Sequence, residues 1–470
     1  MAEIAAGALV AEQVVSTSLE AGAAVSIAKP TQPLKATLSQ IATSSPDDSS
    51  LALARSHHTV TTINDKAYIF GGLHKPGTLC TTDIHAISLP NPKANAKATD
   101  ADQQQQSYAC YPAFPLKDTT TNTLLVPAPR HSHAAAARPS PGQDNNTTAH
   151  LVIHGGLDAD NNPITQDNGC LWLFDTDTLR WSKLAPADPT APYPSQNAAA
   201  ADHLIVFPDA KDPNTLLLHG GGGDGGETWV FDLDALRWTQ LPSAPSAGPS
   251  SSSSSTAAFV DGALYTINNS SSGLSGAIHV LRYPGSPNNN KSVPPATEQQ
   301  QQQEQHDYKW ETIDFPTNPL AAPGPKAREG PSASLVAVST GYGRHYLVYM
   351  FGRVPNSANA NETTQQQQQQ HPFCSDVWAL QVPSHGFNPA AVKDVIRDKV
   401  LPSSVESGAY SWAEVDILPT EQVATEGKVH PGPRAFVGAS SCLDGKGVVF
   451  WGGENAGGQR ESDGWLLKIQ

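Results

Sequence analysis

A short apolar run that ends in two glycines recurs along the 470-residue chain, and no other feature constrains the fold as strongly. Clear copies read AYIFGG (67–72), LVIHGG (151–156), LLLHGG (216–221) and VVFWGG (448–453). Two weaker relatives, LYTINN (264–269) and YLVYMFGR (346–353), lie between the third copy and the last. Gly-Gly is typical of a buried strand that ends in a tight turn close to another backbone. Its recurrence indicates a repeat architecture.

Each Gly-Gly run lies within a larger unit that has the same order of elements. A strand of small residues, often opened by arginine, precedes the run; in the third unit we place it at PSQNAAAA, from Pro194. A second apolar strand, usually opened by an acid, follows the run. Four units then end in a tryptophan strand, at Trp181, Trp238, Trp310 and Trp412. The alternation is that of strands, so we predict six four-stranded units with tryptophans wedged between neighbouring sheets.

This order of elements resembles the kelch repeat of β-propellers, from about residue 35 to residue 470. The resemblance implies an all-β, six-bladed kelch propeller over residues 33–470, with one unit per blade. The last unit stops after its third strand, so we predict that PLKATLSQIAT (33–43) pairs with the C-terminal blade and closes the ring. In residues 1–32, apolar side chains at roughly helical spacing predict a short N-terminal helix that docks on the rim or binds a partner.

The insertions between the units are of two kinds. Polar low-complexity stretches, among them residues 91–106, 243–255, 284–307 and 355–371, are predicted to be disordered because they offer too little apolar area to bury. The stretch NPAAVKDVIRDKVL (388–401) differs, because its valines and isoleucine recur at helical spacing. It predicts a short amphipathic helix between the third and fourth strands of the fifth blade, and a surface for a partner.

Composition narrows the classes of partner and compartment. The net charge of −15, without any cluster of Lys and Arg, argues against nucleic acid as a partner. The chain has no apolar stretch long enough to span a membrane and no signal peptide, so we expect no membrane partner. Its five cysteines are widely spaced and form no CxxC motif, which favours a reducing compartment. We therefore expect a monomeric cytoplasmic protein, with access to the nucleus left open.

The resemblance also implies a candidate site at the centre of the ring. The first strands of kelch blades line a central channel, and arginines lie near one mouth. The candidates are Arg55, Arg130, Arg328 and Arg434, with His57, His58, His131 and His133 beside them. Guanidinium groups bind carboxylate or phosphate at two points, so the set suits an anionic ligand. In the other interpretation, these residues satisfy buried carbonyls and acids of adjacent blades and hold the propeller together.

Two classes of function follow from the resemblance. The first is an intracellular scaffold for a protein partner, which would bind loops on one face, namely the loops after the Gly-Gly runs and the blade-five insertion. The alternative is a small-molecule enzyme or binder at the channel mouth, such as a lyase or isomerase of the plant specifier kind, which this chain resembles in build. Specifier proteins hold ferrous iron through Glu-x3-Asp-x3-His. That spacing is absent here, so no metal or other cofactor is expected, although iron ligands from separate blades remain an alternative.

Overall fold

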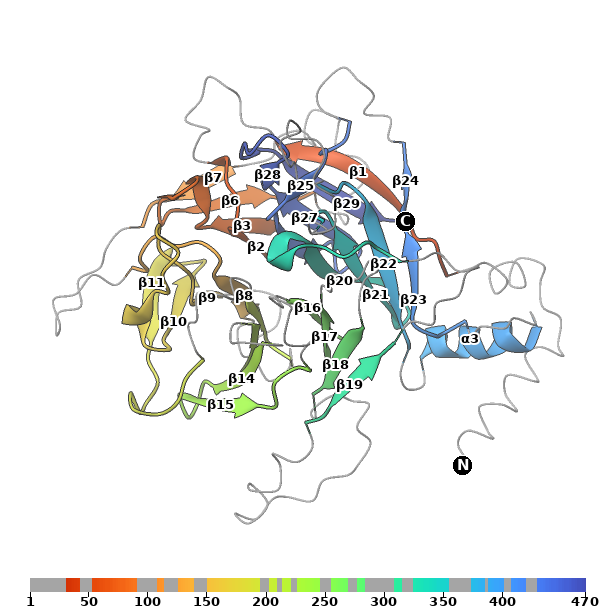
Figure 1. Ribbon diagram of the computed structural model, residues 1–470, viewed down its shortest axis with the longest axis horizontal. Coiled ribbons are helices and arrows are strands. Elements are labelled where there is room, and N and C mark those ends of the chain that lie inside the picture. Colours follow the sequence, from red (N-terminus) through yellow and green to blue (C-terminus); the bar gives the residue numbers. More distant parts are fainter. Residues whose placement is uncertain are drawn as a thin grey trace, which may run out of the picture.

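Six antiparallel sheets surround a central axis in the computed structural model (Figure 1). The structure describes residues 31–42, 53–90, 108–113, 126–138, 150–194, 203–208, 214–220, 226–245, 255–268, 277–283, 308–314, 324–354, 373–384, 388–400, 407–419 and 429–470. The predicted all-β, six-bladed propeller is therefore confirmed. The predicted N-terminal helix and the low-complexity insertions lie, apart from a few residues at their edges, outside these ranges.

Each sequence unit forms one blade, whose first strand lies nearest the axis. Blades 1 to 3 comprise β2 (Thr59–Ile63), β3 (Lys66–Phe70), β6 (Ile84–Ser88) and β7 (Tyr108–Tyr111); β8 (Ala134–Arg138), β9 (His150–His154), β10 (Leu171–Asp175) and β11 (Arg180–Leu184); and β12 (His203–Val206), β13 (Thr215–Gly220), β14 (Glu227–Asp232) and β15 (Arg237–Leu241). Blades 4 and 5 comprise β16 (Ser255–Val260), β17 (Ala263–Asn268), β18 (Ile278–Arg282) and β19 (Trp310–Ile313); and β20 (Ser334–Gly341), β21 (Arg344–Met350), β22 (Val377–Val382) and β23 (Ser411–Glu414).

The sixth blade joins the two parts of the chain that are farthest apart in sequence. Its strands are β26 (Gly438–Cys442), β27 (Gly447–Trp451), β29 (Gly464–Ile469) and β1 (Lys35–Ala42). The strand expected over 33–43 thus lies antiparallel to β29, with Leu38 opposite Leu467. A fifth strand, β24 (Asp416–Leu418), pairs in parallel with β1. Because β24 follows the outer strand of blade 5, it covers the edge of β1 and ties blade 5 to blade 6, which the repeat pattern does not predict.

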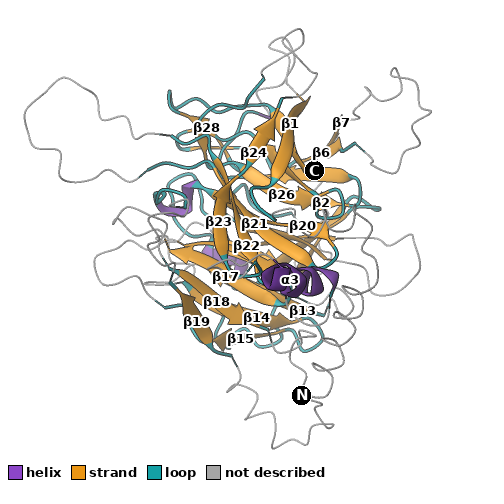
Figure 2. Cartoon of the chain, turned by 90° about the vertical axis from the view of Figure 1, so that its right-hand side faces the viewer, coloured by secondary structure: helices purple, strands orange, loops and turns teal. Residues whose placement is uncertain are grey.

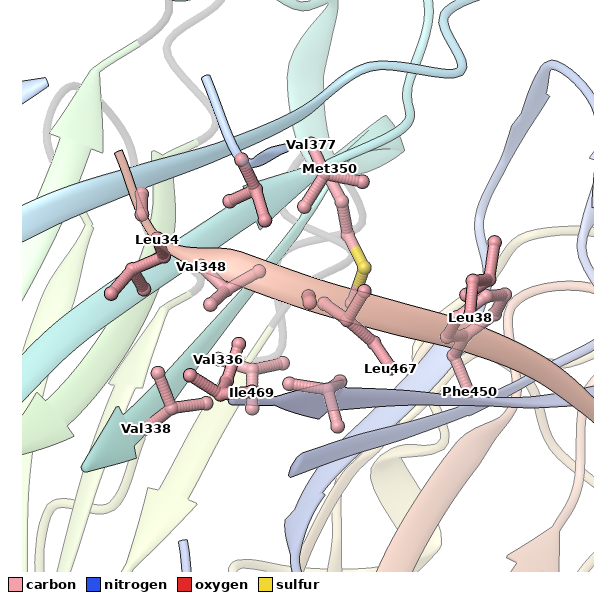
Figure 3. Packing of buried hydrophobic residues seen from close by; sticks show 14 of the residues in the cluster. Leu34, Leu38, Val336, Val338, Val348, Met350, Val377, Phe450, Leu467 and Ile469 are labelled. Atoms are coloured by element: carbon pink, nitrogen blue, oxygen red, sulfur yellow. The ribbon is translucent and has the colours of Figure 1, made fainter. Parts of the chain in front are cut away.

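Apolar side chains fill the space between neighbouring blades. Between blades 5 and 6, Val336, Val348 and Met350 pack against Leu38, Phe450 and Leu467 (Figure 3). The predicted tryptophan wedges are confirmed: the Trp181 ring of blade 2 lies 5.4 Å from the Phe70 ring of blade 1. In the same way Trp238 contacts His154 of the preceding blade, at 5.2 Å between ring centroids. Each wedge therefore stabilises the contact with the blade before it.

Short elements complete the described part of the chain. Two small two-stranded sheets, β4 (Leu73–Lys75) with β5 (Thr78–Leu79) and β25 (Arg434–Ala435) with β28 (Glu454–Asn455), lie next to the Gly-Gly turns. The 3₁₀ turns are η2 (Thr165–Asp167) and η4 (Gly330–Ser332). The α-helix of this part, α3 (Pro389–Val400), lies between β22 and β23 as predicted and projects from the rim (Figures 1 and 2).

The first strand of blade 3 differs from the prediction. The strand lies at His203–Val206, several residues after the predicted PSQNAAAA segment, and pairs with Leu217–Gly220 of β13. Ile205 is buried there. Leu, Ile and Val suit a half-buried pleated strand. The prediction for this strand was wrong because a run of alanines does not by itself mark the first strand of a blade, although in blade 2 such a run, AAAAR, forms β8.

Candidate functional site at the Gly-Gly end of the propeller

The four arginines lie where second strands turn into third strands, which we call the Gly-Gly end. All four side chains are fully buried. Each guanidinium donates to a carbonyl of its own blade: Arg130 Nη1 to Gly155 O at 2.7 Å, Arg434 Nη1 to Gly452 O at 2.9 Å, Arg55 Nη1 to Gly71 O at 2.9 Å and Arg328 Nε to Phe351 O at 2.8 Å. The arginine therefore holds the Gly-Gly turn in place from inside the blade.

Three of the arginines also pair with an acid beside the third strand. Arg130 lies 2.8 Å from Asp167, Arg434 lies 2.8 Å from Asp463, and Arg328 lies 2.6 Å from Asp376. Two of these carboxylates also accept from an indole of the third strand, Asp376 from Trp378 Nε1 at 2.8 Å and Asp167 from Trp172 Nε1 at 3.1 Å. In blades 5 and 6 the acid that opens the third strand thus neutralises the buried guanidinium, and in blade 2 Asp167 of η2 does so.

The backbone of three of the arginine residues connects its blade to the blade before it. The N–H of Gly72 donates to Arg130 O at 2.9 Å, that of Gly352 to Arg434 O at 2.9 Å and that of Gly453 to Arg55 O at 2.8 Å. The arginine and the second position of the Gly-Gly turn therefore recur together because they meet across the gap between blades. These contacts are the ones expected if the arginines satisfy buried carbonyls and acids and hold the propeller together. A ligand role for the arginines stays a prediction.

A cavity of about 190 Å³ occupies the centre of the ring. Every blade contributes to its wall from the first strand, through Val60, Ala135, Ile205, Ala257, Leu335 and Ala439. His57, His58 and His133 also line it, whereas none of the four arginines does. Of the predicted site residues, the structure thus brings His57, His58 and His133 to the channel wall, whereas His131 and the four arginines do not line it.

A chain of backbone hydrogen bonds runs around one mouth of this cavity. Phe436 N donates to Ser332 O at 3.0 Å, His57 N to Phe436 O at 3.1 Å, and Ser132 N to His57 O at 2.8 Å. His57, Ser132 and Phe436 all have φ near +50°, at 56°, 51° and 56°. Four consecutive blades, 5, 6, 1 and 2, are therefore linked at the mouth by backbone bonds. The linking residue of blades 6, 1 and 2 has the same left-handed conformation, which is rare for residues other than glycine.

The channel histidines are neutral at pH 7. The pKa of His57 is lowered to about 3, mainly by burial and in addition by the nearby His131, Arg460 and Arg353. Burial also lowers the pKa values of His58 and His133 well below the usual range. His133 Nε2 bonds to Thr59 Oγ1 at 2.8 Å, but its Nδ1 and both ring nitrogens of His58 have no hydrogen-bond partner among the described residues. The mouth therefore offers polar but uncharged imidazoles.

Two arginines that the sequence reasoning missed surround His57. The Arg353 guanidinium lies 4.8 Å above the Phe436 ring, which stacks on His57 at 4.0 Å. Arg460 Nε donates to Ser56 Oγ at 3.2 Å. Each has an acidic partner, Glu329 at 3.3 Å for Arg353 and Glu454 at 3.2 Å for Arg460. Arg353 is the last residue of the weaker Gly-Gly relative of the fifth unit, so the repeat pattern could have predicted its place near the mouth. Nothing in the sequence around Arg460 predicts its place there.

Three ordered loops project side by side from blades 6, 1 and 2, and we call residues 73–79, 157–163 and 454–460 the loop platform. The first is the β4–β5 hairpin. In the other two, an Asx side chain holds the turn: Asp158 Oδ1 accepts from the N–H of Asp160 and Asn162, and Asn455 Oδ1 from those of Gly457 and Gln459. This type of turn is rigid because its side chain replaces a backbone acceptor.

The platform loops are joined to the blades and to each other. Leu73 N donates to Ser56 O at 2.8 Å, and Ser56 Oγ in turn accepts from Arg460, so the loops of blades 1 and 6 share one residue. A Cβ on Gly77 would lie 3.8 Å from Ala159 O, which places the loops of blades 1 and 2 in contact. The tips, including Lys75, Asp160 and Gln459, are exposed. The platform is thus an ordered surface with exposed tips.

Other site types were sought in the described part of the chain. There, no group of three or more His, Cys, Asp or Glu side chains is arranged to hold a metal ion. Within the same residues, no helix has both the length and the apolar character needed to cross a bilayer. The five cysteines are free thiols.

Comparisons with known proteins give weak likenesses. A scan against models of protein families finds no match for the chain. Acyl-CoA-binding domain-containing protein 4 of Arabidopsis thaliana is 27% identical over 189 residues, which are 40% of this chain and 23% of that protein, so the chain spans less than a quarter of that relative's length. Among solved structures, YjhT matches with a TM-score of 0.46 and 14% identity, over 89% of this chain and 97% of that one. The fold therefore stands on the sheet topology described above.

Proposed function

We propose that the chain is a kelch-type propeller that acts inside the cell as a scaffold for a protein partner, which binds the loop platform. The observation that carries this proposal is the platform itself, with three hydrogen-bonded loops side by side on adjacent blades and exposed tips. A preformed surface loses little conformational freedom when it binds, which favours affinity. The five free thiols are consistent with the reducing cytoplasm, and nuclear access stays open.

The geometry also separates the two loop surfaces expected from the sequence. Strands alternate in direction, so the loops after the Gly-Gly runs leave one end of each blade. Helix α3 connects β22 to β23 at the other end, where Ala390 N donates to Tyr342 O of the β20–β21 hairpin. The two surfaces cannot face one partner from the same side, which corrects the expectation that one face presents both. The proposal keeps the platform.

The test is a charge reversal on the platform, in the full chain purified from its native cells. Lys75→Glu with Asp160→Lys reverses two exposed tips of blades 1 and 2. The matched control, Asp65→Lys with Lys66→Glu, reverses two exposed residues of the β2–β3 hairpin at the opposite end. Both double variants keep the net charge. Quantitative mass spectrometry then measures the copurifying proteins.

The platform variant should lose a near-stoichiometric partner by about tenfold or more, because misplaced like charges in an interface cost several kcal/mol. The control variant should keep it. If both variants retain the partner, or if the wild-type protein purifies alone, the platform proposal is wrong.

A second candidate function rests on the central cavity. His58 and His133 present unpaired ring nitrogens next to a space of about 190 Å³. Neutral imidazoles donate and accept hydrogen bonds and can take up a proton, so the cavity suits a small uncharged polar ligand. Mass spectrometry of the small molecules released when the purified protein is denatured tests this candidate. A reproducible stoichiometric compound would support it, and release of solvent and buffer alone would contradict it.

A further inference from the structure

We propose that residues 3–28 fold back as an amphipathic helix onto a groove at the end of the propeller opposite the platform. The groove has a volume of about 480 Å³. It lies between the start of β1, the β20–β21 hairpin and α3, and its walls include Thr31, Leu34, Tyr342, Tyr346, Ala390 and Lys393. We call it the α3 groove. It is separate from the platform, so this inference does not depend on the proposed function.

Helix α3 is held in place by polar contacts rather than by an apolar stripe. Asp394 is buried and forms an ion pair with Arg344, which also donates to Ala390 O at 3.3 Å. Ala391 N donates to Asn388 Oδ1 at 2.8 Å, which caps the start of the helix. Val392 and Ile396, expected to anchor the helix, are only partly buried. The apolar side chains of α3 are therefore not consumed by its own attachment.

One large apolar side chain of the groove is uncovered in the described structure. Tyr342, at the tip of the β20–β21 hairpin, lines the groove and is 81% exposed, more than any other large apolar side chain of the described residues. Leu34 and Tyr346 also line the groove. The exposed Val395, in contrast, lies about 200° around α3 from the groove-lining Lys393 and faces away. A groove with an exposed aromatic ring at its edge is an arrangement that receives an amphipathic helix.

The chain itself enters at this groove. Tyr346 Oη donates to Thr31 O at 2.8 Å, and Gln32 Nε2 donates to Ser411 O at 3.1 Å and to Ala379 O at 3.2 Å. Residue 31 is thus fixed on the groove wall, and the preceding residues start from there. A segment tethered so closely competes at an effective concentration in the millimolar range with any occupant from solution.

The preceding sequence matches the groove in pattern and in charge. Its apolar residues recur at roughly helical spacing, namely Ile4, Leu9, Val10, Val14, Val15 and Leu19. Residues 1–28 contain three glutamates and no lysine or arginine. The groove is lined by Lys35 and Lys393, and the neighbouring Asp394 of α3 is neutralised by Arg344. The last turn of α3 carries Arg397 and Lys399 with one acid, Asp398. An acidic amphipathic helix on a groove with an excess of basic side chains combines burial with complementary charge.

Photo-crosslinking from the groove wall tests the proposal in the full-length chain. Tyr342→p-benzoylphenylalanine replaces one exposed aromatic ring by another at the edge of the groove. The expected product has the mass of one chain, joins residue 342 to a peptide within residues 3–28, and forms in a yield that does not change on dilution. Val15→Asp should lower this yield by about tenfold or more, because an ionised carboxylate does not enter an apolar contact.

A matched variant separates the contact from general effects of charge. Gln13 lies two residues from Val15, about 200° around a helix, so Gln13→Asp adds the same charge on the opposite side and should leave the yield unchanged. Equal loss in both variants, or no loss in either, would overturn the proposal. So would a product with the mass of two chains whose yield rises with concentration, since that would assign the groove to a second copy.

Discussion

Arg130→Met should destabilise the propeller by about 3 kcal/mol, near the lower end of the range for breaking a buried ion pair. The Arg130 guanidinium holds Gly155 O and Asp167, and the Asp167 side chain is only 4% exposed. The substitution leaves this carboxylate with Trp172 Nε1 at 3.1 Å and Lys183 Nζ at 3.7 Å. These two donors compensate in part, which sets the expected loss near the lower end. Urea unfolding, followed by tryptophan fluorescence, measures it.

Arg328→Met is the matched comparison, because Arg328 makes the same contacts in blade 5. Its partner Asp376 is 28% exposed, so water can solvate the carboxylate that is left behind. The expected loss is therefore smaller, roughly 1–2 kcal/mol. Adding Asp167→Asn to Arg130→Met removes the stranded charge and should restore about 1 kcal/mol.

The order of these losses decides the role of the arginines. Arg130→Met must unfold at a lower urea concentration than Arg328→Met, and both below the wild type. If Arg130→Met unfolds with the wild type, or if Arg328→Met is the more damaging change, the buried pairs do not stabilise the Gly-Gly turns of the blades. A role for the arginines in binding an anion would then be the better interpretation.

Two further predictions concern the turn glycines and the buried histidines. Gly71→Ala should lower the free energy of unfolding in urea by at least about 2 kcal/mol more than Gly155→Ala does. The φ angle is positive at both positions, but a Cβ at residue 71 would lie 2.5 Å from Arg130 O, whereas none of the described atoms lies within 4 Å of a Cβ at residue 155. Equal losses would contradict the contact. Burial lowers the pKa of His58 far below 6.5, so the unfolded chain takes up the proton first as the pH falls, and stability that is complete above pH 6.5 is lost below it. His58→Val, which copies Val437 of blade 6, should reduce this slope by up to about 1.4 kcal/mol per pH unit, and an unchanged slope in unfolding measured from pH 7 to pH 4 would show that His58 does not titrate in this way.

The fold was predictable because each blade repeats its own local pattern. The Gly-Gly runs, the acids and the tryptophans recur because similar contacts recur at several junctions between blades. Helix α3 was predictable from its spacing, but its anchor was not, since the Asp394–Arg344 pair joins residues 50 positions apart. The parallel pairing of β24 with β1 joins residues still farther apart and leaves no local signal.

The candidate site was less accessible to sequence reasoning. The arginines and histidines near the first strands were found from the repeat. Whether each side chain reaches the channel wall depends on its position along the strand and on how it packs, which the repeat pattern does not give. Arg460 reaches Ser56 and the neighbourhood of His57 only through the closure of the ring, which brings blade 6 next to blade 1. Each loop of the platform follows a Gly-Gly run and was predicted from it, but the repeat does not show that the loops of blades 6, 1 and 2 meet in space.

The central claim is that a partner binds the loop platform. Hydrogen exchange of the copurified complex, compared with that of the free protein, tests it most directly. The account predicts slower exchange of backbone amides within residues 73–79, 157–163 and 454–460, and unchanged exchange in the β2–β3 and β26–β27 hairpins at the opposite end. Protection confined to those hairpins or to α3, with the platform amides unchanged, would contradict it.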